Sequence, residues 1–366
     1  MLEDKVTKAF FTLFRAGLWN HSLNDREFPC LSHADWDVLF QFAVRQTVEG
    51  IVFDGVQKLD KDLLPPRELH IKWLIRVEQI GKLNRRMNSI ITEQSVFFSK
   101  INLQPLLLKG QGVAMCYENP DRRVCGDIDW YFPSIQDFQT ANQELIQRGF
   151  NIIPMPGYSS CYVWKDCQID HHQKLFDLYN PFLSKYLRDL QFQQMEEQIR
   201  VHRQGVEWLL LSPLLQILQV NSHILKHLLS FGIGIRQLCD AAVLYKNYHN
   251  RIDGSELKRV YAKLKILRWI NLLHHILVKY IGLPPEYLPF PMEKGTSADW
   301  MMQEIWQSGN FGFYDVRYQK ETPQQLFKRE KTKVRIWKNF IKYVPYAPME
   351  AMSFPLIHFY SGLKIK

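Results

Sequence analysis

Two aspartates near the middle of the chain have the spacing of a metal site. Asp127 and Asp129 lie in the run DIDWYF, residues 127–132, which alternates polar and apolar residues until Pro133 ends it. Because side chains alternate along a strand, both carboxylates point to one side, about 7 Å apart. Divalent cations bridge such carboxylates, whereas two unshielded acids would repel each other. The pair indicates a site for one or two cations, with a solvated strand edge as the alternative.

A second feature, upstream of the aspartates, is suited to phosphate. The apolar stretch Leu106-Leu107-Leu108 ends at the turn Lys109-Gly110-Gln111-Gly112, and a short helical run follows to Tyr117. A strand that ends in a glycine-rich turn before a helix presents free backbone N–H groups and the positive end of the helix. Lys109 adds a positive charge there, so the turn is suited to a triphosphate.

These two features together resemble a known signature. Residues 107–132, LLKGQGVAMCYENPDRRVCGDIDWYF, look like a poorly characterised bacterial branch of the DNA polymerase β-like nucleotidyltransferase superfamily. The matching positions are Leu108, Lys109, Gly110, Tyr117, Pro120, Arg123, Gly126, Asp127 and Asp129. The branch also has an Asp-x-His on a later strand and a histidine-rich helix followed by an Arg and an Asp. The residues that match these later patterns are Asp170, His172, His223, His227, Arg236 and Asp240.

The resemblance implies a Mg²⁺-dependent nucleotidyl transfer from an NTP, with ATP as the first choice, to an unknown acceptor hydroxyl. Asp127, Asp129 and Asp170 would hold two Mg²⁺ ions, for which Mn²⁺ can substitute, unless Asp170 acts as the base instead. In-line attack at the α-phosphate would then expel pyrophosphate.

The nucleotide phosphates are expected to contact the residues between the two features. Lys109 and the turn residues Gly110, Gln111 and Gly112 would receive the β- and γ-phosphates. Arg123 is a candidate for a bidentate phosphate or carboxylate contact, and its alternative is a structural pair with Asp127 or Asp121.

Histidines supply further candidates for the cleft wall. His223 and His227 lie four residues apart on one predicted helix face, which is the spacing of a metal pair, but no third ligand accompanies them. We expect that one of them bonds Asp240 or that they line the nucleotide cleft, together with Arg236. On the strand near residue 170, the period of two places His172, not His171, on the side of Asp170.

The elements that must position these residues predict an α+β fold. Residues 101–204 combine short strands with one helix, and we expect a nucleotidyltransferase-like catalytic domain with a small mixed or antiparallel sheet and flanking helices. Residues 1–100 predict an N-terminal helical region, with a capping box at Ser32. Residues 205–290 predict a helical domain in which the chain returns to helices from about residue 205. Ser212-Pro213 is a helix start signal there, and one helix runs from about residue 255 to 281.

The remaining residues, 291–366, predict a basic, aromatic-rich C-terminal region. Between Arg317 and Lys342 there are nine Lys or Arg residues and two acids, interleaved with Tyr318, Phe327, Trp337 and Phe340. Such a segment can bind RNA or another polyanion. A solvated basic helix face is the other interpretation, because no RNA-binding motif accompanies the charge.

The composition agrees with a metal-requiring centre. The chain of 366 residues has a net charge of +9, yet residues 105–204 carry −2 while 205–290 and 291–366 carry +5 each. The six cysteines form no CxxC pair, no basic leader opens the chain, and the longest apolar stretch is interrupted by polar residues. These features predict a cytoplasmic protein without a membrane span.

Three hypotheses for function follow. The first is a Mg²⁺-dependent nucleotidyltransferase, and the second is a catalytically inactive protein of the same fold that binds a nucleotide or a partner. The third is an RNA-binding module that works through the basic C-terminal region, whose affinity would fall steeply with salt.

Overall fold

The computed structural model describes residues 4–155, 157, 159–293, 295–315, 317 and 329–364. Its helices are α1 (Lys5–Trp19), α2 (His33–Arg45), α3 (Glu49–Val56), α4 (Arg67–Lys100), α5 (Lys109–Ala114), α6 (Ile135–Gln147), α7 (Ser184–Gln193), α8 (Pro213–Leu229), α9 (Ile235–Tyr248), α10 (Gly254–Lys263), α11 (Leu267–Ile276), α12 (Asp299–Ser308), α13 (Arg329–Tyr343) and α14 (Pro348–Lys364). Its strands are β1 (Leu106–Leu107), β2 (Asp127–Tyr131), β3 (Ile153–Met155), β4 (Ser159–Trp164), β5 (Cys167–His172), β6 (Ile199–Arg203) and β7 (Val206–Leu210).

The strands form one mixed sheet in the order β3-β4-β5-β2-β1-β7-β6. The central strands β2 and β5 are parallel, and their register places Asp129 opposite Asp170. Strand β1 is antiparallel to β2 and parallel to β7. This mixed sheet among helices confirms the α+β class that the sequence predicts.

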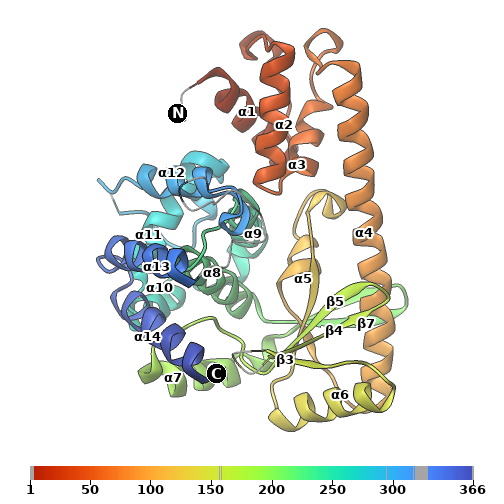
Figure 1. Ribbon diagram of the computed structural model, residues 1–366, viewed down its shortest axis with the longest axis vertical. Coiled ribbons are helices and arrows are strands. Elements are labelled where there is room, and N and C mark those ends of the chain that lie inside the picture. Colours follow the sequence, from red (N-terminus) through yellow and green to blue (C-terminus); the bar gives the residue numbers. More distant parts are fainter. Residues whose placement is uncertain are drawn as a thin grey trace.

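One face of the sheet is covered by the long helix α4 and by α6 (Figure 1). The buried side chains of this layer include Met87, Ile91 and Phe98 of α4 and Ile128 and Trp130 of β2. The indole N–H of Trp130 donates to Gln94 Oε1 at 2.7 Å. Because Ile128 and Trp130 are directed to this core, the strand period turns Asp127 and Asp129 to the opposite face.

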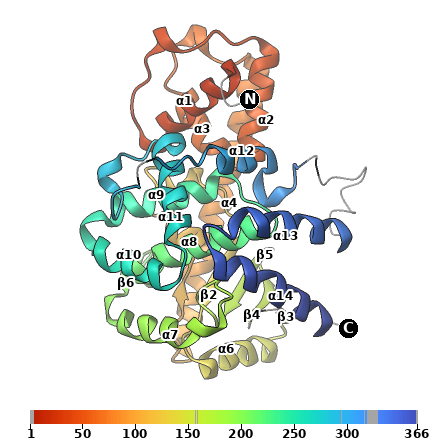
Figure 2. The same ribbon diagram turned by 90° about the vertical axis from the view of Figure 1, so that its left-hand side faces the viewer.

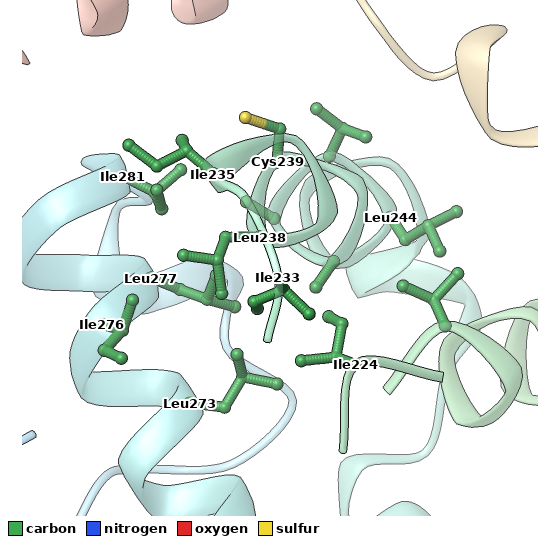
Figure 3. Close-up of a cluster of buried hydrophobic side chains, with 14 of the residues drawn as sticks. Ile224, Ile233, Ile235, Leu238, Cys239, Leu244, Leu273, Ile276, Leu277 and Ile281 are labelled. Atoms are coloured by element: carbon green, nitrogen blue, oxygen red, sulfur yellow. The ribbon is translucent and has the colours of Figure 1, made fainter. Parts of the chain in front are cut away.

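A larger hydrophobic core joins the N-terminal helices α1–α3 to the helices that follow the sheet. Helices α8 and α9 pack against each other, and Figure 3 shows Ile224, Leu238 and Leu273 converging where α8, α9 and α11 meet. These three side chains are fully buried. The core therefore holds α8 and α9 as a layer that faces the polar side of the sheet (Figures 1 and 2).

Several predicted helix ends are confirmed. Ser32 and Asp35 form the capping box of α2, and the Ser212 side chain accepts from the Leu215 N–H at the start of α8. The predicted helix from residue 255 to 281 is wrong as a single element. It is broken between α10 and α11, where Lys265 has φ +59° and the Ile266 N–H bonds the Tyr261 carbonyl, as in a Schellman-type helix end.

Strands β6 and β7 correct the prediction that helices begin near residue 205. They form an antiparallel hairpin in which Arg203 pairs with Val206, and β7 extends the sheet beside β1. Gln204 and Gly205 have φ of +50° and +77°, which is the backbone that a two-residue hairpin turn requires. The apolar run that forms β7 is too short for its periodicity to distinguish a strand from a helix, which explains the wrong prediction. The division into four parts by residue number stays a prediction.

In the described part of the chain, no helix has both the length and the apolarity that a bilayer crossing requires.

Candidate active site

The polar face of the sheet and helices α8 and α9 enclose a cavity of about 510 Å³. From the sheet side it is lined by Lys109, Gly110, Asp127, Asp129, Asp170 and His172. From the helices it is lined by His223, Lys226, His227, Arg236 and Asp240. The structure thus brings together most of the predicted site residues from segments that are far apart in the sequence.

Asp129, Asp170 and His172 form a cluster in the lining of this cavity. One ligand atom from each lies within 4.8 Å of the others, and this trio is the one such group of three in the described chain. The ring Nε2 of His172 lies 2.7 Å from Asp129 Oδ1. The other oxygen, Asp129 Oδ2, is buried and has no hydrogen-bond partner among the described residues. A buried acceptor without a donor is costly, so a cation fits here, and His172 joins the predicted ligands Asp129 and Asp170.

Asp127 lines the same cavity and lies two residues before Asp129 on β2, opposite Gln168 in the β2–β5 register. The charge of Asp129, together with burial, raises the pKa of Asp127. Burial also raises the pKa of Asp170. Raised pKa values mean that burial and mutual repulsion disfavour the charged forms of these carboxylates when no cation is bound.

Lys109 supplies the nearest positive charge to the acid cluster. Its Nζ lies 3.3 Å from Asp129 Oδ1. Burial alone would raise the pKa of Asp129, but the Lys109 charge and the His172 hydrogen bond outweigh it, and the pKa of Asp129 is lowered. Conversely, Asp129 and Asp127 outweigh burial and raise the pKa of Lys109. Lys109 is therefore a permanent cation beside the proposed metal site.

The predicted phosphate turn contributes less to the cavity than the sequence suggests. Gly110 lines it with φ +50°, where a Cβ would approach Cys125 Sγ to 3.3 Å. The side chain of Gln111 is instead buried against α4, and its Nε2 donates to Asn84 Oδ1 at 2.8 Å. A phosphate contact by Gln111 stays a prediction. Gly112 does not line the cavity either, because it packs against Leu107 and Leu210.

Arg123 makes a bidentate contact to a carboxylate, which is one of the contacts that the sequence predicts for it. Its Nε and Nη2 donate to the two carboxylate oxygens of Asp240, each at 2.8 Å, and the pair is buried. Tyr117 donates a further hydrogen bond of 2.6 Å to Asp240. The structural partner is thus Asp240 of α9, not Asp127 or Asp121, and this fork connects the sheet side of the cavity to its helical side.

The histidines of α8 line the cavity, but neither bonds Asp240. His223 Nδ1 lies 2.9 Å from Asp177 Oδ2, and Lys226 Nζ lies 2.7 Å from the other oxygen. Burial and the nearby charge of Lys109 lower the pKa of His223 to about 4. The His227 ring packs edge-on against His223, with centroids 4.3 Å apart. Arg236 contacts Thr47 through a hydrogen bond of 3.3 Å.

Asp177 and Lys226 are site residues that sequence reasoning missed. Asp177 lies in the segment after β5, where no strand or helix period marks its direction. Lys226 could have been found, because it follows His223 by three residues and therefore shares its helix face.

The basic C-terminal region is partly paired within the fold. Arg317 Nε lies 2.8 Å from Asp315 Oδ1, and Lys342 Nζ lies 2.8 Å from Glu304 Oε1. Arg335 also lies near Asp315, at 3.6 Å. Tyr318 and Phe327 lie outside the described residues. RNA binding by this region stays a prediction.

A comparison with protein families gives the class of this protein, which is that of the nucleotidyltransferases. Residues 32–282 match the model of a family described as "Uncharacterised nucleotidyltransferase", and the chain belongs to that family. Among curated proteins, none matches the chain. One solved structure, described as an antigenic nucleotidyltransferase-like protein from Paracoccidioides brasiliensis, is similar at 14% identity and a TM-score of 0.33, over 54% of this chain and 92% of that one. The assignment rests on the family match.

Proposed function

We propose that the protein transfers a nucleoside monophosphate from an NTP, with ATP as the first choice, to an acceptor hydroxyl. The observation that carries this proposal is the buried, unpartnered Oδ2 of Asp129 beside Asp170 and His172 in the cavity. Asp129, Asp170 and His172, with Asp127 beside them, would hold Mg²⁺ or Mn²⁺. A bound divalent ion would neutralise phosphate charge and lower the pKa of the acceptor hydroxyl.

The side chains of the cavity supply the remaining functions. Lys109 and the backbone at Gly110 would bind the β- and γ-phosphates, and Arg236 would add a second positive charge from α9. His223 is oriented by Asp177 and, with its pKa near 4, is neutral at pH 7. Its neutral ring can accept a hydrogen bond from the acceptor hydroxyl, and Asp170 either joins the metal site or acts as the base.

Turnover tests this proposal. The full chain is incubated with each NTP and Mg²⁺ or Mn²⁺, and pyrophosphate release is measured. We expect release from the wild type, and loss of at least about 1,000-fold in the double variant Asp127→Asn, Asp129→Asn. Asp166→Asn is the matched control, because the Asp166 side chain is 90% exposed.

The second candidate, an inactive protein that binds a nucleotide, predicts binding without pyrophosphate. Titration with a fluorescent ATP analogue, combined with the pyrophosphate assay, separates the two candidates. If the analogue binds but no pyrophosphate is released with any NTP, metal ion or added mixture of acceptors, the inactive protein is supported. Metal binding that survives in the double variant would contradict the assigned site.

A further inference from the structure

A second cavity lies next to the first. It has a volume of about 330 Å³, within the range of small-molecule pockets. The two cavities share Lys109, His172 and Lys226 as lining residues, whereas Asp127, Arg236 and Gly110 line only the first. A molecule in the second cavity would therefore meet the acid cluster at His172 without entering the space next to Asp127.

The C-terminal helix α14 builds one wall of this second cavity. Glu350 accepts hydrogen bonds from the backbone N–H groups of Tyr179 at 2.6 Å and Asn180 at 3.1 Å. The rings of Tyr179 and Phe354 meet edge to face with centroids 5.3 Å apart. In Figure 2, α14 crosses in front of the sheet toward β3 and β4. These contacts hold α14 against the segment that contains Tyr179 and Asn180, so the wall of the cavity has a fixed position.

The chemistry of the lining is apolar on one side and cationic on the other. Leu175 and Phe354 are buried, and with Tyr179 they supply apolar surface. Asp177, an acid in the lining, already bonds both His223 and Lys226. Lys174 has no carboxylate within ion-pair distance in the described chain, and its Nζ donates to the Leu178 carbonyl at 2.8 Å. Its Nζ also lies 5.3 Å from the centroid of the Tyr179 ring. Because an ammonium group has three N–H donors, one N–H remains for an anion.

We propose that the second cavity binds the acceptor, and that the acceptor is a small hydroxyl compound with an apolar body and an anionic group. Lys174 would bind the anionic group, a carboxylate or a phosphate, while Leu175, Tyr179 and Phe354 contact the apolar part. The hydroxyl would lie toward His172 and Lys109, where the two cavities meet. This inference rests on the proposed nucleotidyl transfer and names its substrate class.

The step that follows is balanced. The acceptor oxygen forms a bond to the α-phosphorus of the NTP, and the bond from that phosphorus to the bridging oxygen of the β-phosphate breaks. Pyrophosphate leaves with the electron pair, and the hydroxyl proton passes to Asp170 or to solvent. No oxidant or reductant is required.

Ligand-observed NMR on the full chain tests the site with three probes: 3-phenylpropionate, phenyl phosphate and the neutral 3-phenylpropanol. We expect at least one anionic probe to bind about 10-fold more tightly than the alcohol, as one charge-assisted contact provides. The carboxylate and phosphate arms show which anion the cavity prefers. Lys174→Met should remove the preference, and Leu175→Trp should block all three probes.

Nucleotide binding is followed in parallel with a fluorescent ATP analogue. Lys174→Met and Leu175→Trp should keep the wild-type affinity for this analogue, because neither residue lines the first cavity. Mn²⁺ added to the wild type should broaden the bound probe signals, and Asp129→Asn should abolish that broadening.

Three outcomes would overturn the acceptor site: no probe binds, the alcohol binds as well as the anions, or ATP with Mg²⁺ displaces the probes. The last would assign the second cavity to the triphosphate. If the wild type does not bind the ATP analogue, the proposed function is contradicted, but the NMR probes still report on the second cavity. Failure of the proposed function and failure of the acceptor site are therefore distinguishable.

Discussion

The two walls of the cavity are built by different physical means. On the sheet wall, Asp127, Asp129, Asp170 and His172 come from the adjacent parallel strands β2 and β5, and the hydrogen-bond ladder sets their spacing. On the helical wall, His223, Lys226 and Arg236 come from α8 and α9, whose positions depend on hydrophobic packing. The sheet wall is acidic and the helical wall is basic. We therefore assign the proposed metal binding to the sheet wall, whereas the proposed phosphate contacts are divided between Lys109 on the sheet side and Arg236 on the helical wall.

The first prediction separates metal binding on the two walls. Asp129→Asn should weaken Mn²⁺ binding by about 100-fold or more, since even residues that only support a metal ligand change affinity by about 10- to 100-fold. His223→Gln on the helical wall should leave Mn²⁺ affinity near the wild-type value. Titration monitored by electron paramagnetic resonance measures both. Equal losses in the two variants would show that the division between walls is wrong.

The next effect concerns the contact that joins the walls. Arg123→Met leaves Asp240 buried without its cation, which costs about 3–5 kcal/mol of the free energy of unfolding. Arg85→Met is the matched control, because the Arg85–Asp121 pair is exposed, with side-chain exposures of 58% and 34%, and exposed pairs contribute about 0–1 kcal/mol. Urea unfolding gives both values. Similar losses would mean that the Arg123–Asp240 pair does not stabilise the junction.

A pH experiment tests the layer behind the helical wall. His274 of α11 is fully buried and its Nε2 lies 3.3 Å from the Tyr245 hydroxyl of α9. Burial lowers the pKa of His274 from 6.5 to about 3. Below about pH 6.5, the unfolded chain therefore binds a proton at His274 that the folded chain does not bind. This difference decreases the free energy of unfolding by about 1.4 kcal/mol for each pH unit below about 6.5.

Thermal and urea unfolding between pH 7 and 4 measure this slope. His274→Gln should show a slope shallower by about one proton. His202→Gln should keep the wild-type slope, because the His202 side chain is 81% exposed. A variant slope equal to that of the wild type would mean that His274 is protonated in the folded protein.

The smallest expected effect is on nucleotide affinity from the helical wall. Arg236→Gln should raise the KM for the NTP by about 10-fold, the value of one charge-assisted hydrogen bond, while Mn²⁺ affinity stays unchanged. Arg259→Gln on α10 is the control, since that side chain is 77% exposed. Steady-state pyrophosphate release measures KM. An unchanged KM would assign phosphate binding to the sheet wall alone.

The sequence by itself determined the local parts of this site. A strand period of two places Asp127 with Asp129, and Asp170 with His172, because alternation is a property of the extended backbone. The Lys-Gly turn and the helix caps are equally local, since their hydrogen bonds close within a few residues. The α+β class follows from these elements.

Only the tertiary structure decided which residues meet. Arg123 bonds a residue 117 positions away, and His223 bonds one 46 positions away, so no local period reports either partner. Gln111 has a place in the predicted turn but bonds α4, because a buried amide must find a partner. The parallel register of β2 and β5 also brings His172 to Asp129. Such pairings depend on how distant elements pack, and that depends on the whole core.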